Sequence, residues 1–110
     1  MKKYTVIWLE TAKENFIDIV QYLKSVIAPE AARKVYNNLI NDINQLEEFP
    51  HAHPFVQYEE YRKQGVQILI TGKYICFYII EGTSVEIHHI VHQSQDYSKL
   101  FFFKPSGRNV

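Results

Sequence analysis

The sequence has one cysteine, no net charge and no long hydrophobic run. The single cysteine, Cys76, excludes an internal disulfide framework and is consistent with a reducing compartment. Its neighbours on both sides are apolar or aromatic. A nucleophilic thiol needs a neighbour that lowers its pKa, so we expect a buried structural thiol instead.

The chain also lacks a segment that would span or cross a membrane. Every apolar run is shorter than the roughly 18 residues that span a bilayer. Tyr4 to Leu9 is too short for the apolar region of a secretory signal, and Glu10 follows directly. We therefore expect a cytoplasmic protein with no membrane partner.

The absence of net charge excludes a whole-molecule attraction to nucleic acid. The charges are unevenly distributed, however. Residues 1–60 carry six Lys and Arg against nine Asp and Glu, whereas residues 61–110 carry six against three. The carboxy-terminal half is therefore the better candidate for an anionic partner, although ordinary surface charge explains the same asymmetry.

The chain is rich in the residues that build a core. Apolar residues make up 46% and aromatic residues 15% of its 110 residues, more than a disordered chain would hold. This length is usual for one domain. We expect a single domain over residues 1–103 and a frayed tail over residues 104–110.

Local patterns predict a strand and then a helical hairpin. Lys3 to Leu9 mixes β-branched and aromatic residues, as strands do. Thr11 and Glu14 have the spacing of a capping box at the start of a helix. Apolar residues then recur at three- and four-residue steps as far as Ile27. Pro29 suits the first position of a second helix.

Three β-rich runs follow the helices: Val66 to Thr71, Tyr74 to Ile80 and Val85 to Val91. The short turns between them favour an antiparallel meander. Ser94 to Phe103 is expected to form a short terminal helix or turn. Helices grouped beside a mainly antiparallel sheet define an α+β fold.

In this order and length the chain resembles the toxins of the RelE/ParE superfamily. The resemblance covers roughly Tyr4 to Phe101 and implies an N-terminal strand, a helical hairpin and a three-stranded antiparallel meander. Four segments carry it: Thr11–Glu14, Ala31-Ala32, Leu46–Pro50, and Tyr74–Ile80 followed by Val85–Asp96.

The resemblance implies the toxin of a type II toxin–antitoxin system, of the kind that serves plasmid stabilisation, with a cognate antitoxin as its partner. RelE-like members cut mRNA on the ribosome without a metal or other cofactor, and ParE-like members inhibit DNA gyrase. Both targets stay open. The alternative, from another class, is a non-toxic or degenerate relative that acts only as an antitoxin-binding module.

Metal-free RNA cleavage needs a base, an acid and cations that stabilise the charged transition state. Ile75 stands where the RNA-cutting relatives usually carry an arginine, and Gln93 to Gln95 stand where they are basic. The residues that remain as catalytic candidates are His92, Tyr97 and Arg62. The candidates for binding phosphate or the target are Lys63, Lys73, Lys99 and Lys104.

Each of these candidates has an ordinary structural role as its alternative. His92 could pair with Tyr97, or it could order the terminal turn by bonding Asp96 or a backbone group. Arg62 could bind a phosphate or an acidic antitoxin residue, or it could be a solvated surface residue.

Period-two alternation sorts the last strand into two faces. Glu86, His88, Ile90 and His92 share one face, and Val85, Ile87, His89 and Val91 share the other. His89 is therefore expected to be a hydrogen-bonded core histidine. The His51/His53 and His88/His89 pairs lack the spacing of a zinc module, so we expect no metal site.

Three consecutive aromatic residues, Phe101 to Phe103, end the apolar part of the chain. They cannot all point inward, so some apolar surface should be exposed, and such a surface commonly marks a partner site. Phe101, Phe102 and Phe103 are therefore the predicted antitoxin-binding residues.

Overall fold

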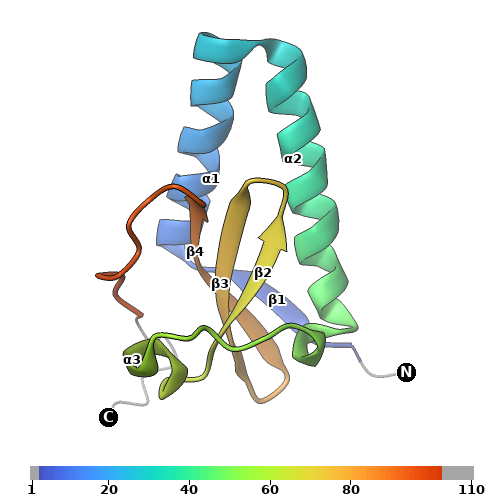
Figure 1. Ribbon diagram of the computed structural model, residues 1–110. Helices are drawn as coiled ribbons and strands as arrows, with labels where there is room; N and C mark the ends of the chain where they lie inside the picture. The colour runs from blue at the N-terminus through green and yellow to red at the C-terminus, as the bar shows by residue number, and fades with distance from the viewer. Residues whose placement is uncertain (1–2, 103–110) are drawn as a thin grey trace.

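A four-stranded sheet carries a helical hairpin on one face (Figure 1). The computed structural model describes residues 3–102. The elements are β1 (Thr5–Trp8), α1 (Glu10–Tyr22), the π-helical turn η1 (Leu23–Ile27), α2 (Pro29–Asn44), the 3-10 turns η2 (Gln45–Glu47) and η3 (Pro50–Ala52), α3 (Glu59–Arg62), β2 (Val66–Thr71), β3 (Tyr74–Glu81) and β4 (Ser84–His92).

The expected α+β order is confirmed. The strands lie in the order β1-β4-β3-β2, with antiparallel pairing throughout the meander and parallel pairing of β1 with β4. Gly72 and Gly82 form the tight turns of the meander with positive φ angles of 63° and 62°, where a residue with a Cβ would be strained. After β4 the described chain forms turns and irregular backbone, so the turn rather than a terminal helix is present over residues 93–102.

The first helix begins earlier than the capping box predicted. Its N-cap is Leu9, which makes no side-chain cap, so the prediction that Thr11 caps the helix is wrong. The Leu9 N–H donates to the Ile87 carbonyl of β4, and the Leu9 carbonyl accepts from Lys13. The chain therefore passes directly from sheet to helix. Pro29 occupies the first turn of α2, as expected.

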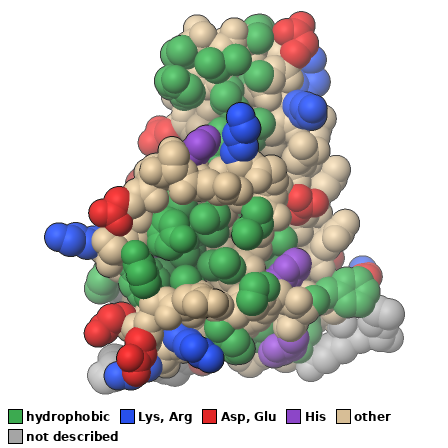
Figure 2. Space-filling model, viewed as in Figure 1, with side chains coloured by type: hydrophobic (Ala, Val, Ile, Leu, Met, Phe, Trp, Pro, Cys, Tyr) green, Lys and Arg blue, Asp and Glu red, His purple; other side chains and the backbone are tan. Residues whose placement is uncertain are grey.

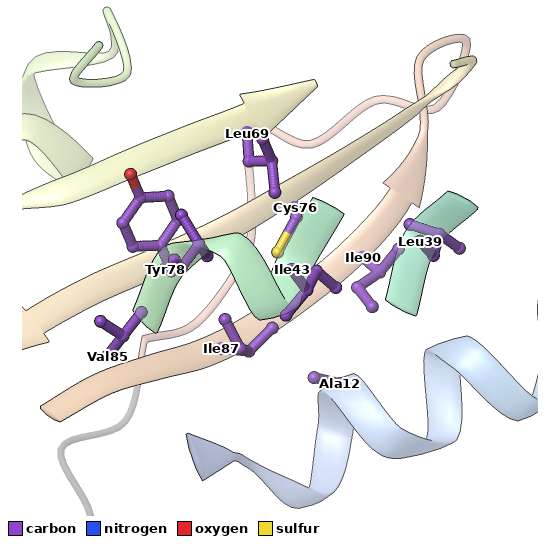
Figure 3. Packing of buried hydrophobic residues seen from close by; sticks show 10 residues of the cluster. Ala12, Leu39, Ile43, Leu69, Cys76, Tyr78, Val85, Ile87 and Ile90 are labelled. Atoms are coloured by element: carbon purple, nitrogen blue, oxygen red, sulfur yellow. The ribbon is translucent and has the colours of Figure 1, made fainter. Parts of the chain in front are cut away.

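The main core lies between the hairpin and the sheet (Figure 3). Leu39 and Ile43 of α2 face Ile87 and Ile90 of β4, and Cys76 of β3 is fully buried among them. Burial raises the pKa of the Cys76 thiol and keeps it neutral. The expectation of a structural thiol is confirmed.

A second apolar cluster covers the opposite side of the sheet, which we call the outer face. Its strand residues include Val66, Ile75, Phe77 and Val91. Residues from three segments outside the strands cover them: Val56, Tyr61, Tyr97, Leu100 and Phe102. The sheet is therefore packed on both sides.

Among the described residues, none of the helices has the length and apolar character that a membrane span requires.

A β-bulge in β4 breaks the alternation expected for this strand. Phe77 pairs with His89 and Tyr78 pairs with Ile87, which leaves His88 as the extra residue. Ile90 therefore lies with Val85 and Ile87 in the helix-side core, whereas Val91 lies on the outer face. The predicted faces are wrong from His89 onward, because one inserted residue reverses every side chain that follows it.

Candidate functional site

His92 lies at the end of β4, where its ring orders the following turn. Its Nδ1 accepts a hydrogen bond from the Ser94 backbone N–H at 3.1 Å and lies 2.8 Å from the Ser94 hydroxyl. The ring also packs edge-on against Tyr74, with centroids 5.4 Å apart. Of the two structural roles considered for His92, the bond to a backbone group is present, through Ser94 rather than Asp96.

Tyr97 lies on the other side of the sheet. Its ring packs against Phe77 and Tyr58, with centroids 5.2 and 5.9 Å apart. Phe77 belongs to the outer-face cluster, whereas Tyr74, the partner of His92, packs against the helix-side core. The structure therefore does not bring His92 and Tyr97 together as an acid/base pair.

The predicted cations within residues 3–102 are exposed and lie at three separate places in the fold. Arg62 ends α3, and Lys63 follows it, 3.9 Å from Glu59 in an exposed ion pair. Lys73 lies in the turn between β2 and β3, and Lys99 lies in the carboxy-terminal segment. Lys104, Phe103 and the predicted frayed tail over 104–110 lie outside the described residues.

Phe101 and Phe102 have opposite environments. Phe102 is 6% exposed and packs against Tyr61, His89 and Phe77, with ring centroids 4.8, 5.1 and 6.1 Å apart. Phe101 is 73% exposed. The expectation that consecutive aromatics cannot all point inward is confirmed, and Phe101 is the described member that is accessible to a partner.

Two side chains fasten the carboxy-terminal segment to the outer face. The Tyr61 hydroxyl donates to the Tyr97 carbonyl and accepts from the Leu100 N–H, both at 2.7 Å. His89 Nε2 lies 2.6 Å from the Phe101 carbonyl, to which it donates. His89 is buried, as expected for a hydrogen-bonded core histidine. Burial lowers the pKa of His89, and the bond to Phe101 opposes this effect.

Sequence reasoning missed a buried acid next to a buried histidine. Glu86 and His88 of β4 are 5% and 2% exposed, and His88 Nε2 lies 3.6 Å from Glu86 Oε1. The His88 ring is 5.5 Å from that of Phe102. An acidic residue within an apolar strand was the available signal, because a buried carboxylate needs a polar partner.

The strands of the meander carry apolar side chains where an RNA-binding sheet would carry cations. None of the residues of β2, β3 and β4 is a lysine or an arginine. Ile75 and Phe77 are buried on the outer face, and Ile70 at the end of β2 is 57% exposed. Figure 2 shows apolar side chains gathered over the strands. Within residues 3–102, no group of three or more His, Cys, Asp or Glu is placed to hold a metal ion.

Comparison with known proteins gives a consistent result. Residues 6–97 match the family described as the ParE toxin of the type II toxin–antitoxin system, parDE. The chromosomal ParDE system of P. aeruginosa holds a chain that is similar with a TM-score of 0.69 and 17% identity, over 82% of this chain and 96% of that one. A chain of the toxin–antitoxin complex RelBE2 of Mycobacterium tuberculosis is similar with a TM-score of 0.56 and 21% identity, over 86% of this chain and 97% of that one. No curated protein matches the chain.

Proposed function

Because the chain belongs to the ParE toxin family of type II toxin–antitoxin systems, we propose that it arrests growth by inhibiting DNA gyrase rather than by cutting mRNA. The observation that supports this proposal most directly is that β2, β3 and β4 contain no lysine or arginine. A nuclease that works on this sheet would need cations close to the phosphate that it cleaves.

The positions that matter most for RNA cleavage hold neutral residues. Ile75 is buried in an apolar cluster, and Gln93 to Gln95 are exposed but uncharged. Losing one group that stabilises the transition state typically lowers a rate by a factor of about 10² to 10³. The separation of His92 from Tyr97 removes the acid/base pair as well. A surface rich in exposed apolar residues instead supports a protein target.

The same proposal includes an antitoxin partner. Its expected contact is Phe101, since a largely exposed aromatic side chain is a common anchor in protein interfaces. Arg62, Lys63, Lys73 and Lys99 are proposed to contact acidic groups of the antitoxin or the target. In this proposal the protein acts in the cytoplasm and stabilises the replicon that encodes it.

Expression of the chain alone, and together with the small gene next to its own, tests the proposal. We expect growth arrest, relief of the arrest by the neighbouring gene product, and an induced DNA-damage response with intact messages. The purified chain should inhibit supercoiling by gyrase.

The alternatives give different results in the same experiments. Messages cleaved on ribosomes, with supercoiling unaffected, would assign the nuclease activity. Absence of arrest despite soluble, folded protein would assign the non-toxic antitoxin-binding module.

A further inference from the structure

The strand β2 forms one edge of the sheet, and its backbone groups alternate between the two sides (Figure 1). Thr71 and Tyr74 flank the two-residue turn to β3 and form a hydrogen-bonded pair. The odd-numbered residues of β2 therefore direct their N–H and carbonyl groups toward β3. The even-numbered residues, Val66, Ile68 and Ile70, direct theirs away from the sheet.

A segment that precedes α3 covers only the first half of this edge. The Val56 N–H donates to the Val66 carbonyl, and the Ile68 N–H donates to the Pro54 carbonyl, both at 3.0 Å. In the described part of the chain, nothing bonds the outward N–H and carbonyl of Ile70. An edge strand with unpaired backbone groups is a template for another strand.

The side chain of Ile70 adds apolar surface to the open half of the edge. It is 57% exposed and lies on the outer face, where Val66 and Ile68 of the same strand pack into the outer-face cluster. Proteins commonly protect an edge strand with a charged residue, a proline or a bulge. β2 contains no charged residue and no proline, and its register with β3 is unbroken. The open half is therefore able to pair with another strand.

We propose that this open edge pairs with the same edge of a second copy of the chain, antiparallel and with Ile70 opposite Ile70. A two-fold axis then passes between the two residues, and each Ile70 N–H donates to the Ile70 carbonyl of the other copy. The two Ile70 side chains stand on the same face and cover each other. The two sheets join into one, with both helical hairpins on the same side.

The charges of the chain favour a second copy as the occupant. The chain has 12 basic and 12 acidic residues, so two copies do not repel each other through net charge. The charged residue nearest to Ile70 along the chain is Lys73. Each Lys73 lies three residues from the axis, on opposite sides, so the two are roughly 20 Å apart at about 3.3 Å per residue. This separation exceeds the screening length of about 8–10 Å.

The space beside the β2–β3 turn permits this register. Gly72 of one copy lies next to Ile68 of the other, at the end of the covering segment. A Cβ atom built on Gly72 would meet no atom of the described chain within 4 Å. The paired stretch runs only from Ile68 to Gly72, and small interfaces of this kind are weak. We therefore expect a dimer that dissociates in the micromolar to millimolar range.

Sedimentation of the full chain at micromolar to millimolar concentrations tests the proposal. We expect a reversible equilibrium between monomer and dimer. Hydrogen exchange at the Ile70 amide should slow as the protein concentration rises, because the dimer gives this N–H a partner. Exchange at the Ile68 amide, which already bonds the Pro54 carbonyl, should change little and is the internal control.

Charged residues at the axis test the register. Ile70→Lys and Ile70→Glu each place like charges directly opposite each other and should weaken the dimer by about tenfold or more. An equal mixture of the two variants should associate more tightly than either alone, since opposite charges then face each other. Ile27→Lys changes an isoleucine of the hairpin that is 59% exposed and should leave the dimer unaffected. Thermal unfolding shows whether all three variants remain folded.

Several results would overturn the proposal. One is a wild-type chain that stays monomeric at millimolar concentration, with exchange at Ile70 independent of concentration. Others are an equal loss of association in Ile70→Lys and Ile27→Lys, and a mixture of the two Ile70 variants that gains nothing. Protection of the Ile70 amide only after addition of the neighbouring gene product would assign the edge to a strand of that partner. None of these measurements involves gyrase, so they are independent of the proposed function.

Discussion

The Tyr61 hydroxyl and the Tyr97 carbonyl are 2.7 Å apart, although 36 residues separate them in the chain. The same hydroxyl accepts the Leu100 N–H. One phenol in α3 therefore satisfies two backbone groups of the carboxy-terminal segment. This arrangement holds the segment over the outer face, and it keeps Tyr97 and Phe102 against Phe77.

Tyr61→Phe should therefore loosen the carboxy-terminal segment. The substitution keeps the ring and removes both hydrogen bonds, so we expect a loss of about 1–3 kcal/mol in the free energy of unfolding. Urea unfolding measures the loss, and hydrogen exchange at the Leu100 amide should become faster. Tyr58→Phe is the matched control on an exposed side chain. Unchanged exchange at Leu100 would contradict the assigned role.

The sequence predicted the elements well because their signals are local. The bounds of β2 agree with the apolar run Val66 to Thr71, and Pro29 correctly marked the start of α2. The helix start at Glu10 was missed because it depends on a hydrogen bond from Leu9 to Ile87, a residue far along the chain. A short sequence window does not contain both residues and therefore does not predict such a bond.

The faces of the last strand were harder to predict, because they depend on one inserted residue. The bulge at His88 reverses the faces of the residues after it, and alternation alone does not reveal a bulge. The Ile90 N–H is satisfied by the Asn15 side chain of α1, at 3.0 Å. Only the tertiary structure brings Asn15 to this position. The two hydrogen bonds between Tyr61 and the carboxy-terminal segment also depend on the tertiary structure, so the sequence does not predict them.

His92→Gln tests whether the chain acts as a nuclease. If His92 only orders the turn after β4, growth arrest and inhibition of gyrase should persist in the variant, because Gln can still accept a hydrogen bond from Ser94. A nuclease that used His92 as its base would lose about 10² to 10⁴ in rate. Growth assays and supercoiling assays distinguish the two. Loss of arrest in a folded His92→Gln protein would favour RNA cleavage.

His89 should make stability depend on pH. Burial lowers its pKa below the ordinary value of 6.5, so the unfolded chain binds a proton at this residue more readily than the folded chain does. The free energy of unfolding should therefore fall as the pH decreases below 6.5 and should not respond to this residue above that value. Glu86 and His88 are ionisable and lie close by, so the wild-type curve alone does not isolate the contribution of His89.

His89→Gln isolates this contribution, because a glutamine amide can donate to the Phe101 carbonyl without titrating. Urea unfolding between about pH 5 and pH 8 should show a smaller acid-side loss in the variant than in the wild type. Identical pH dependence in the two proteins would show that groups other than His89 cause the acid sensitivity.

Phe101 and Phe102 should separate antitoxin binding from folding. Phe102→Ser removes a buried ring from the outer-face cluster, and truncating a buried aromatic side chain typically costs about 3–5 kcal/mol of stability. Phe101→Ser removes a largely exposed ring and should change stability by about 0.5 kcal/mol or less.

If Phe101 is an anchor for the antitoxin, its loss should weaken the complex by about 1–2 kcal/mol or more, a factor of about 5 to 30 in Kd. Titration calorimetry with the product of the neighbouring gene measures this change, and urea unfolding of both variants provides the control. Unchanged affinity in Phe101→Ser would exclude this residue from the antitoxin interface, while a large loss of stability in the same variant would show that the ring is needed for the fold.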